Sequence, residues 1–314
     1  MFHHYGLFFT QEHVSQAREN RAGDPYAAAW ALLDTYQPSD ALSQAQHSAL
    51  RYRFADDMQA GAQAVQHLQR LNTGADDDRP YIEQVATLVT LAQCFEMLRE
   101  HPAWSDQAAW LEAFDTRLHA LQRPLDDLPF VDQAWLNTLA LVSAIVLERE
   151  DSFQQAVEVF KNIIDHDIHP EGYILKTVQM PAEQQGYYGD GLYRMLLTAQ
   201  ALILTAEAAS HIGADLWVYN NRGVSVMTPL PYLLYYYYFP DKWRWDEGLE
   251  TEPTQALYRA HAGMWEMAQR RASSRDRKTL LDELRPIYDV WGGGLTTLTH
   301  GGTGEPRKRR GWFG

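Results

Sequence analysis

The residues best suited to chemistry lie at the start of one long apolar helix. Residues 184 to 217 read QQGYYGDGLYRMLLTAQALILTAEAASHIGADLW, so tyrosines, glycines and an arginine come directly before a run of strong helix formers. A tyrosine exchanges a proton when a neighbouring cation lowers its pKa, and an arginine neutralises a carboxylate. A helix N-terminus also offers free backbone N–H groups. The pattern predicts a ligand-binding rim that contains Tyr187, Tyr188, Tyr193 and Arg194.

The elements that position this rim are helices, because helical periodicity dominates the chain and strand alternation is scarce. Nearly all-apolar segments span Tyr81 to Arg99, Trp135 to Glu148 and Leu192 to Ser210. They alternate with amphipathic segments at Ser48 to Leu71, Trp104 to Leu121 and Ser152 to Asp165. This alternation predicts an all-α fold with inner and outer helix layers. Hairpins of this kind stack as a solenoid or close into an α/α toroid.

The domain organisation follows from length and composition. A chain of 314 residues with 46% hydrophobic residues can bury a substantial core. We expect one toroid domain over residues 1–290 and a Gly-rich, basic, flexible tail over residues 291–314. The single cysteine, Cys94, excludes an intrachain disulfide and a Cys-rich zinc cluster.

Charge and hydropathy narrow the possible partners. A formal net charge of −14 argues against a general nucleic-acid binder. The longest apolar run, Thr198 to Ala206, is far shorter than the roughly 20 residues that cross a bilayer, so no membrane segment is expected. The N-terminus lacks a basic region and a small-residue cleavage site. We therefore expect a cytoplasmic location for the chain as given, and a periplasmic or secreted one if an export signal has been trimmed.

Three stretches together resemble the helical toroid domain of the alginate lyase and heparinase II/III-like polysaccharide lyase superfamily. They are Tyr5 to Leu33, Ala134 to Ile164, and HPEGYILKTV together with YRMLLTAQALILTAEAASHIGADLW. The resemblance implies an incomplete α/α toroid that cleaves an acidic, uronate-containing poly- or oligosaccharide by β-elimination, with no cofactor.

The resemblance also indicates where this chain departs from the family. The family's central hairpin is entered through Asn-Asn-His or Asn-Trp, which neutralises the uronate carboxylate; here Phe130, Val131 and Asp132 stand there. The family's inner helix opens with Tyr-His, and its tyrosine acts as acid or base. This chain has Tyr193 followed by Arg194, so the histidine is missing from the motif.

A lyase of this type needs a group that neutralises the carboxylate, a base and an acid. Arg194 is the expected neutralising group, and Tyr188 or Tyr193 the expected acid or base. Asn137 and Asp132 are the candidates on the opposing side of the site. The expected substrate-binding residues are Trp135, Gln133, Glu183, Tyr187, Asn221 and Arg222. The alternative interpretation is that the tyrosines only pack or stack and that Arg194 pairs with Glu183 or Asp190.

Two other functions stay open at this point. Toroids also carry glycoside hydrolases, for which Asp132 with Glu183 or Asp190 would supply the two carboxylates. A non-catalytic, carbohydrate-binding or scaffold toroid would explain the missing histidine.

Two further clusters have residue types that suit ligands. His166, Asp167, His169 and Glu171 have metal-ligand types at close spacing, but they stand at a polar junction where solvated charges are ordinary, and we predict no metal site. The run of four tyrosines from Tyr235 to Tyr238 suits either sugar stacking or core packing.

Overall fold

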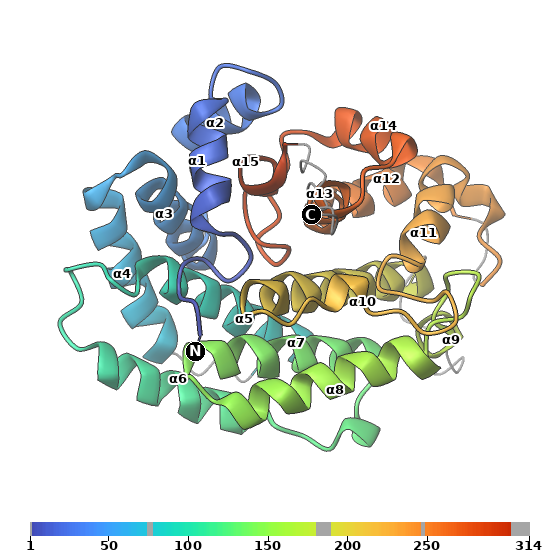
Figure 1. The fold of residues 1–314 in the computed structure, drawn as a ribbon, viewed down its shortest axis with the longest axis horizontal. Helices are drawn as coiled ribbons and strands as arrows, with labels where there is room; N and C mark the ends of the chain where they lie inside the picture. Colours follow the sequence, from blue (N-terminus) through green and yellow to red (C-terminus); the bar gives the residue numbers. More distant parts are fainter. Residues whose placement is uncertain (1, 74–77, 180–189, 246–248, 303–314) are drawn as a thin grey trace, which may run out of the picture.

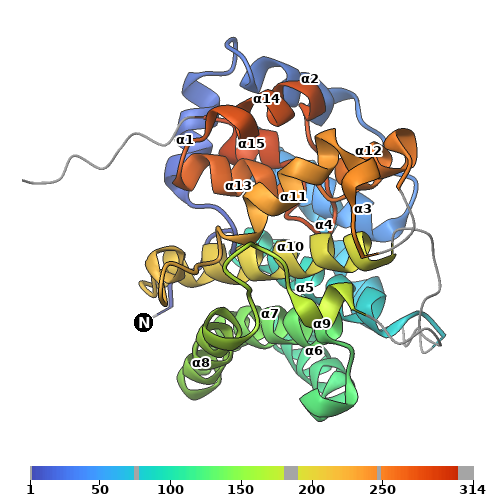
Figure 2. The same ribbon diagram turned by 90° about the vertical axis from the view of Figure 1, so that its right-hand side faces the viewer.

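The computed structural model describes residues 2–73, 78–179, 190–245 and 249–302. Regular secondary structure in these residues is helical, apart from isolated β-bridges. Figure 1 shows helices α5, α7 and α10 side by side through the middle of the molecule, and Figure 2 shows further helices above and below them. The all-helical toroid predicted from the sequence is confirmed.

The inner layer is a row of helices in which each contacts the next. Its members are α3 (Ala41–Ala55), α5 (Tyr81–Leu98), α7 (Phe130–Val146), α10 (Asp190–His211) and α13 (Gly263–Arg271). Helices α5, α7 and α10 are buried nearly all round, as their almost continuous apolar sequences require. They bury much of the hydrophobic core, so they form a rigid frame for the residues at their ends.

The outer layer consists of amphipathic and shorter helices packed on that row. On one side lie α4 (Met58–Thr73), α6 (Gln107–Leu121) and α8 (Glu150–His166), with the short η1 (Leu125–Asp127). On the other side lie α11 (Pro229–Tyr238), α12 (Thr251–Ala260) and α14 (Arg275–Leu284) (Figure 2). The connections carry α9 (Leu175–Val178), η3 (Leu216–Val218) and η4 (Pro240–Lys242).

The terminal helices bring the two ends of the row together. Helix α15 (Thr296–His300) contacts α13, and it also contacts α1 (Gln11–Glu19) and α2 (Tyr26–Thr35). Both α1 and α2 contact α3. The start and the end of the described chain therefore pack against each other.

Two sequence predictions need correction here. The segment from Ser48 to Leu71 is not one outer helix, because Asp56 adopts a left-handed conformation with φ 55° that ends α3, and the Asp57 carboxylate accepts a hydrogen bond from the Ala60 N–H as α4 begins. The predicted flexible tail also begins too early. Leu295 and Leu298 are fully buried, so residues 291–302 belong to the packed domain, and residues 303–314 lie outside the described part.

The inner helices share one direction. The C-terminal residues Arg53 of α3, Glu100 just after α5, Ile145 of α7 and His211 of α10 all line one cavity. The starts of α5, α7 and α10 therefore meet at the opposite end of the layer, which places Tyr81, Asp132 and Arg194 near one another. No helix in the described residues is both long and apolar enough to span a membrane.

Candidate functional site

The candidate site lies where α5, α7 and α10 begin. Arg194 stands at the start of the second turn of α10, and its Nε donates to the Asp190 carboxylate one turn earlier at 3.1 Å. Asp190 is 5% exposed and its Oδ2 has no hydrogen-bond partner among the described residues, whereas the Arg194 side chain is 22% exposed. The ion pair thus holds the guanidinium in place and leaves part of it accessible.

Asp132, in the first turn of α7, lies close enough to Arg194 and Arg123 for their positive charges to affect its carboxyl. Burial raises the pKa of its carboxyl to about 6, and the positive charges of Arg194 and Arg123 offset part of that rise. The Asp132 carboxyl therefore gains or loses its proton at a pH just below neutral. A carboxyl of this kind beside an arginine is typical of a functional site, although a structural ion cluster also produces one.

Tyr81, the first residue of α5, is the third residue placed at this end of the inner helices. Its hydroxyl donates to the Leu121 carbonyl at 2.7 Å, and the Arg123 guanidinium lies 4.9 Å from its ring centre. Burial raises the pKa of Tyr81 to about 12, with Arg123 opposing the rise. Tyr81 is thus a neutral, fixed ring, which suits binding better than proton transfer.

A histidine from a distant segment completes the site. His261 directly follows α12, and its ring centre lies 5.5 Å from that of Tyr193 and 6.3 Å from that of Trp291. Its Nδ1 is buried without a hydrogen-bond partner in the described residues. Burial lowers the pKa of the imidazole, only partly opposed by the charge of Asp289, so the ring is neutral at neutral pH.

A joint of two glycines and one aspartate sets the position of His261 and Trp291. The Asp289 carboxylate accepts hydrogen bonds from the Gly263 N–H at 3.0 Å and the Gly292 N–H at 2.8 Å. A Cβ on Gly263 would lie 2.3 Å from the Gly292 carbonyl oxygen, so only glycine permits this approach. The joint fixes the loop of Trp291 against the segment that carries His261.

The sequence signal for these two residues was weak. His261 and Trp291 stand in no recognisable motif, and the missing histidine was sought only on the inner helix itself. The joint that brings them in depends on contacts between α13 and the loop before α15, which no local spacing encodes. A histidine two residues before the glycine that opens α13 is the hint that the sequence contains.

Three residues predicted for the site have other roles. Trp135 is completely buried and its indole donates to the Leu197 carbonyl at 3.0 Å, so its assignment to substrate binding is wrong. Asn137 is buried and its amide donates to the Ala156 carbonyl of α8 at 3.2 Å. Gln133 donates to the Leu128 carbonyl at 2.9 Å. Helix α7 is covered on several sides, so only residues at its very start reach the site.

The remaining predicted residues fall elsewhere. Asn221 forms a β-bridge with Val224, and the exposed Arg222 between them has φ 53°, which identifies a tight turn after η3. Glu183, Tyr187 and Tyr188 lie outside the described residues, so their roles stay predictions.

Three of the four residues in the polar junction pair with other side chains. Asp167 pairs with Lys176 at 2.7 Å, Glu171 pairs with Arg244 at 3.2 Å, and the His169 ring stacks on Tyr173. These side chains are engaged with different partners.

A buried set of metal-ligand types does occur at the other end of α10. His13, Glu207 and His300 place ligand atoms within 4.8 Å of one another. Glu207 already accepts hydrogen bonds from Trp217 at 2.9 Å and Arg271 at 3.0 Å. Burial opposes its ionisation, but hydrogen bonds with His211 and His300 hold the pKa of Glu207 well below its usual range. We interpret this set as a buried ion network that joins α10 to the terminal helices.

The site has the groups that acid–base chemistry needs. Arg194 supplies a cation, Tyr193 a hydroxyl, and His261 an imidazole whose Nδ1 has no hydrogen-bond partner among the described residues. These groups come from two elements that are far apart in the chain.

Comparison with known proteins identifies solved structures of the same fold, whereas the comparisons by sequence find no match. No family model and no curated protein matches the chain. Among solved structures, an alginate lyase from Bacteroides ovatus superposes with a TM-score of 0.70 at 11% identity, covering 95% of this chain and 99% of that one. A Tyr-to-Phe variant of alginate lyase A1-III with a tetrasaccharide gives 0.69 at 14%, covering 91% and 93%. Alginate lyase A1-III from Sphingomonas species A1 gives 0.65 at 16%, covering 88% and 78%.

Proposed function

We propose that this protein cleaves an acidic, uronate-containing poly- or oligosaccharide by β-elimination. The observation that carries the proposal is the placement of His261 beside Tyr193, the residue that directly precedes Arg194. His261 thus supplies in space the histidine that the sequence motif lacks. The solved structures compared above are alginate lyases, and alginate lyase A1-III was obtained with a tetrasaccharide as a Tyr-to-Phe variant and as a His-to-Ala variant.

The proposed reaction assigns one role to each group. The Arg194 guanidinium pairs with the uronate carboxylate and stabilises the negative charge that develops on it. The imidazole of His261, beside the Tyr193 ring, removes the proton on the carbon next to that carboxylate. The bond from the adjacent carbon to the glycosidic oxygen then breaks, a carbon–carbon double bond forms, and the Tyr193 hydroxyl gives its proton to the leaving oxygen.

The neutral state of His261 supports its role as the base. Because burial lowers the pKa of this imidazole, its unprotonated form predominates at neutral pH. Trp291 and Tyr81 add ring faces against which sugar rings can stack.

The hydrolase alternative is less well supported by the same geometry. Two catalytic carboxylates must flank the glycosidic bond, one of them protonated. Asp190 is nearly buried and ion-paired with Arg194, which restricts its access to a sugar. Asp132 has the raised pKa that an acid needs.

The test is incubation of the purified chain with polymannuronate, polyguluronate and glycosaminoglycans. Elimination creates an unsaturated uronate, so ultraviolet absorbance should rise on at least one substrate in step with new reducing ends. New reducing ends without absorbance would indicate hydrolysis instead. Binding without either signal would indicate a non-catalytic toroid.

A further inference from the structure

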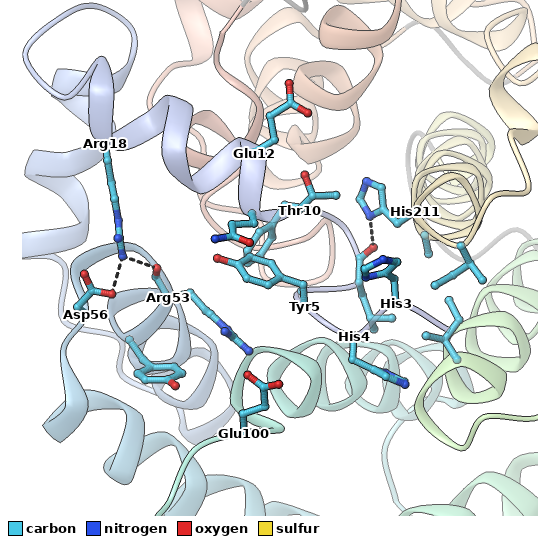
Figure 3. Close-up of a pocket in the computed structure, with 18 of the residues that line it drawn as sticks. His3, His4, Tyr5, Thr10, Glu12, Arg18, Arg53, Asp56, Glu100 and His211 are labelled. Atoms are coloured by element: carbon cyan, nitrogen blue, oxygen red, sulfur yellow. Dashed lines mark hydrogen bonds and ion pairs between the residues drawn. The ribbon is translucent and has the colours of Figure 1, made fainter. Parts of the chain in front are cut away.

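A second cavity lies at the opposite end of the inner helices from the candidate site. It has a volume of about 910 Å³ and is bounded by the N-terminal segment and by the C-terminal ends of α3, α5, α7 and α10 (Figure 3). This size is within the range of small-molecule sites. Nothing in the proposed elimination uses it.

Arg53 is a cation in the wall of this cavity, and it forms no ion pair with an acidic side chain among the described residues. Its guanidinium carbon lies 4.6 Å from the ring centre of Tyr5 and 5.4 Å from that of Tyr52. One nitrogen donates to the Glu96 carbonyl at 3.3 Å, while Nε is buried without a hydrogen-bond partner in the described residues. The other cation in the wall, Arg18, is already paired with Asp56 at 2.7 Å. Arg53 is therefore the group available to an incoming anion.

The helix ends around the cavity have arginine partners that reduce their repulsion of that anion. A helix C-terminus usually exposes carbonyl oxygens, which favour cations. Here arginine side chains satisfy several of them: Arg18 donates to the Phe54 carbonyl at 2.9 Å, and Arg99 donates to the Val146 carbonyl at 2.7 Å. The cavity thus presents a guanidinium where bare helix ends would repel a carboxylate.

The other lining groups suit hydroxyls and a ring. Figure 3 shows the side chains of Tyr5, Arg53 and Glu100 directed toward one another, with Thr10 and Glu12 on the same N-terminal segment. Carboxylates and hydroxyls accept or exchange hydrogen bonds with sugar hydroxyls. A tyrosine face stacks on a sugar ring. The volume exceeds what a single small acid needs and leaves room for more than one sugar unit.

We propose that this cavity binds a short acidic saccharide, with its carboxylate at Arg53 and a sugar ring against Tyr5. The cavity is a second site at the far end of the toroid, separate from the site of elimination. Its occupancy does not require His261, Tyr193 or Arg194, so the two proposals can fail independently.

The test measures binding of sodium glucuronate to the intact chain by isothermal titration calorimetry. We expect Arg53→Gln to weaken binding at least about tenfold, because a charge-assisted contact is lost. Glu100→Gln should strengthen it a few-fold, because the neighbouring negative charge is removed. Glucose, which lacks the carboxylate, should bind at least about tenfold more weakly than glucuronate to the unchanged chain.

Arg194→Gln is the control for location, because it removes the cation that the elimination site would offer to a carboxylate. It should keep the glucuronate binding that Arg53→Gln loses. Loss of binding in this control, with retention in Arg53→Gln, would place the ligand at the other site and overturn the proposal. Equal affinity for glucose and glucuronate would also overturn it, because the carboxylate would then contribute nothing. Equal affinity for glycine and glucuronate would overturn it as well, because the sugar ring would then contribute nothing. If Arg53→Gln fails to fold by circular dichroism, Glu100→Gln and the glucose comparison still decide the question.

Discussion

The ring of His261, which follows α12, lies 5.5 Å from the ring of Tyr193 at the start of α10. The inner helix carries the tyrosine and the arginine, and the segment between α12 and α13 contributes the histidine. The relationship depends on the Asp289 joint, because that carboxylate binds both the backbone at Gly263 and the backbone at Gly292. A site that two distant segments of the chain form together is sensitive to small changes in the contacts that hold those segments.

Removal of either proton-transfer group should abolish most of the elimination. We expect Tyr193→Phe and His261→Ala each to lower kcat by about 10²- to 10⁴-fold, as is typical for the loss of a general acid or base. The measurement is the initial rate of ultraviolet absorbance on the best polyuronide. Tyr235→Phe is the matched control, since Tyr235 is 48% exposed on α11 and should keep full activity. Equal activity of all three variants would refute the assigned roles.

Asn137→Ala should affect stability and leave catalysis intact. The substitution removes a buried hydrogen bond to the Ala156 carbonyl and should lower the free energy of unfolding by about 1–2 kcal/mol. Urea unfolding measures the stability, and kcat/KM should change by less than about twofold. A loss of activity at unchanged stability would return Asn137 to the active site.

Asp132→Asn should stabilise the protein in a pH-dependent way. The folded-state pKa of about 6 lies above the ordinary value of 3.8, so between these values the folded chain holds more protons than the unfolded chain. Stability contributed by this group therefore falls as pH rises through that window, and the charged carboxylate is unfavourable at neutral pH. Because the side chain is partly exposed, we expect a gain of only about 1 kcal/mol at neutral pH.

The same variant should show no such gain at a pH below both values, where Asp132 is protonated in either state. Urea unfolding of the two proteins at neutral pH and near pH 3.5 compares the two cases. A gain that is equal at both pH values would show that the carboxylate charge is not its cause.

Gly263→Ala should damage both stability and activity. Its Cβ would lie 2.3 Å from the Gly292 carbonyl oxygen, a backbone atom that cannot move without shifting the loop of Trp291. We expect a loss of about 1–3 kcal/mol, the usual cost of overpacking, together with reduced kcat. Gly23→Ala is the control, since its Cβ would lie 3.7 Å from the nearest atom. Thermal unfolding and the absorbance assay test both effects, and a Gly263→Ala protein that behaves like the control would contradict them.

The fold was largely predictable because each helix has a local signal. Continuous apolar runs identified α5, α7 and α10 as inner helices, and their burial agrees. The break at Asp56 was missed because a left-handed residue other than glycine leaves almost no trace in composition. The packed residues 291–302 were missed for a related reason: a Gly-rich stretch has the composition of a tail, yet its glycines here permit close backbone approach.

The candidate site was predictable only in part. Tyr193, Arg194 and Asp132 stand at helix starts, where spacing alone places them at one end of the layer. Trp135 and Asn137 lie a turn farther along α7, and the sequence does not tell which side of a wholly apolar helix faces a site and which faces another helix. Their hydrogen bonds to Leu197 and Ala156 carbonyls decide it.

The sequence by itself therefore determined an all-helical, layered chain of acidic net charge with a tyrosine–arginine pair opening its most apolar helix. Hydrophobic periodicity is a local property, so it can be derived from neighbouring residues. Tertiary structure alone decided that His261 and Trp291 join that pair, and that a second cavity lies at the other end around Arg53. Both depend on contacts between segments far apart in the chain, which arise only when the helices pack.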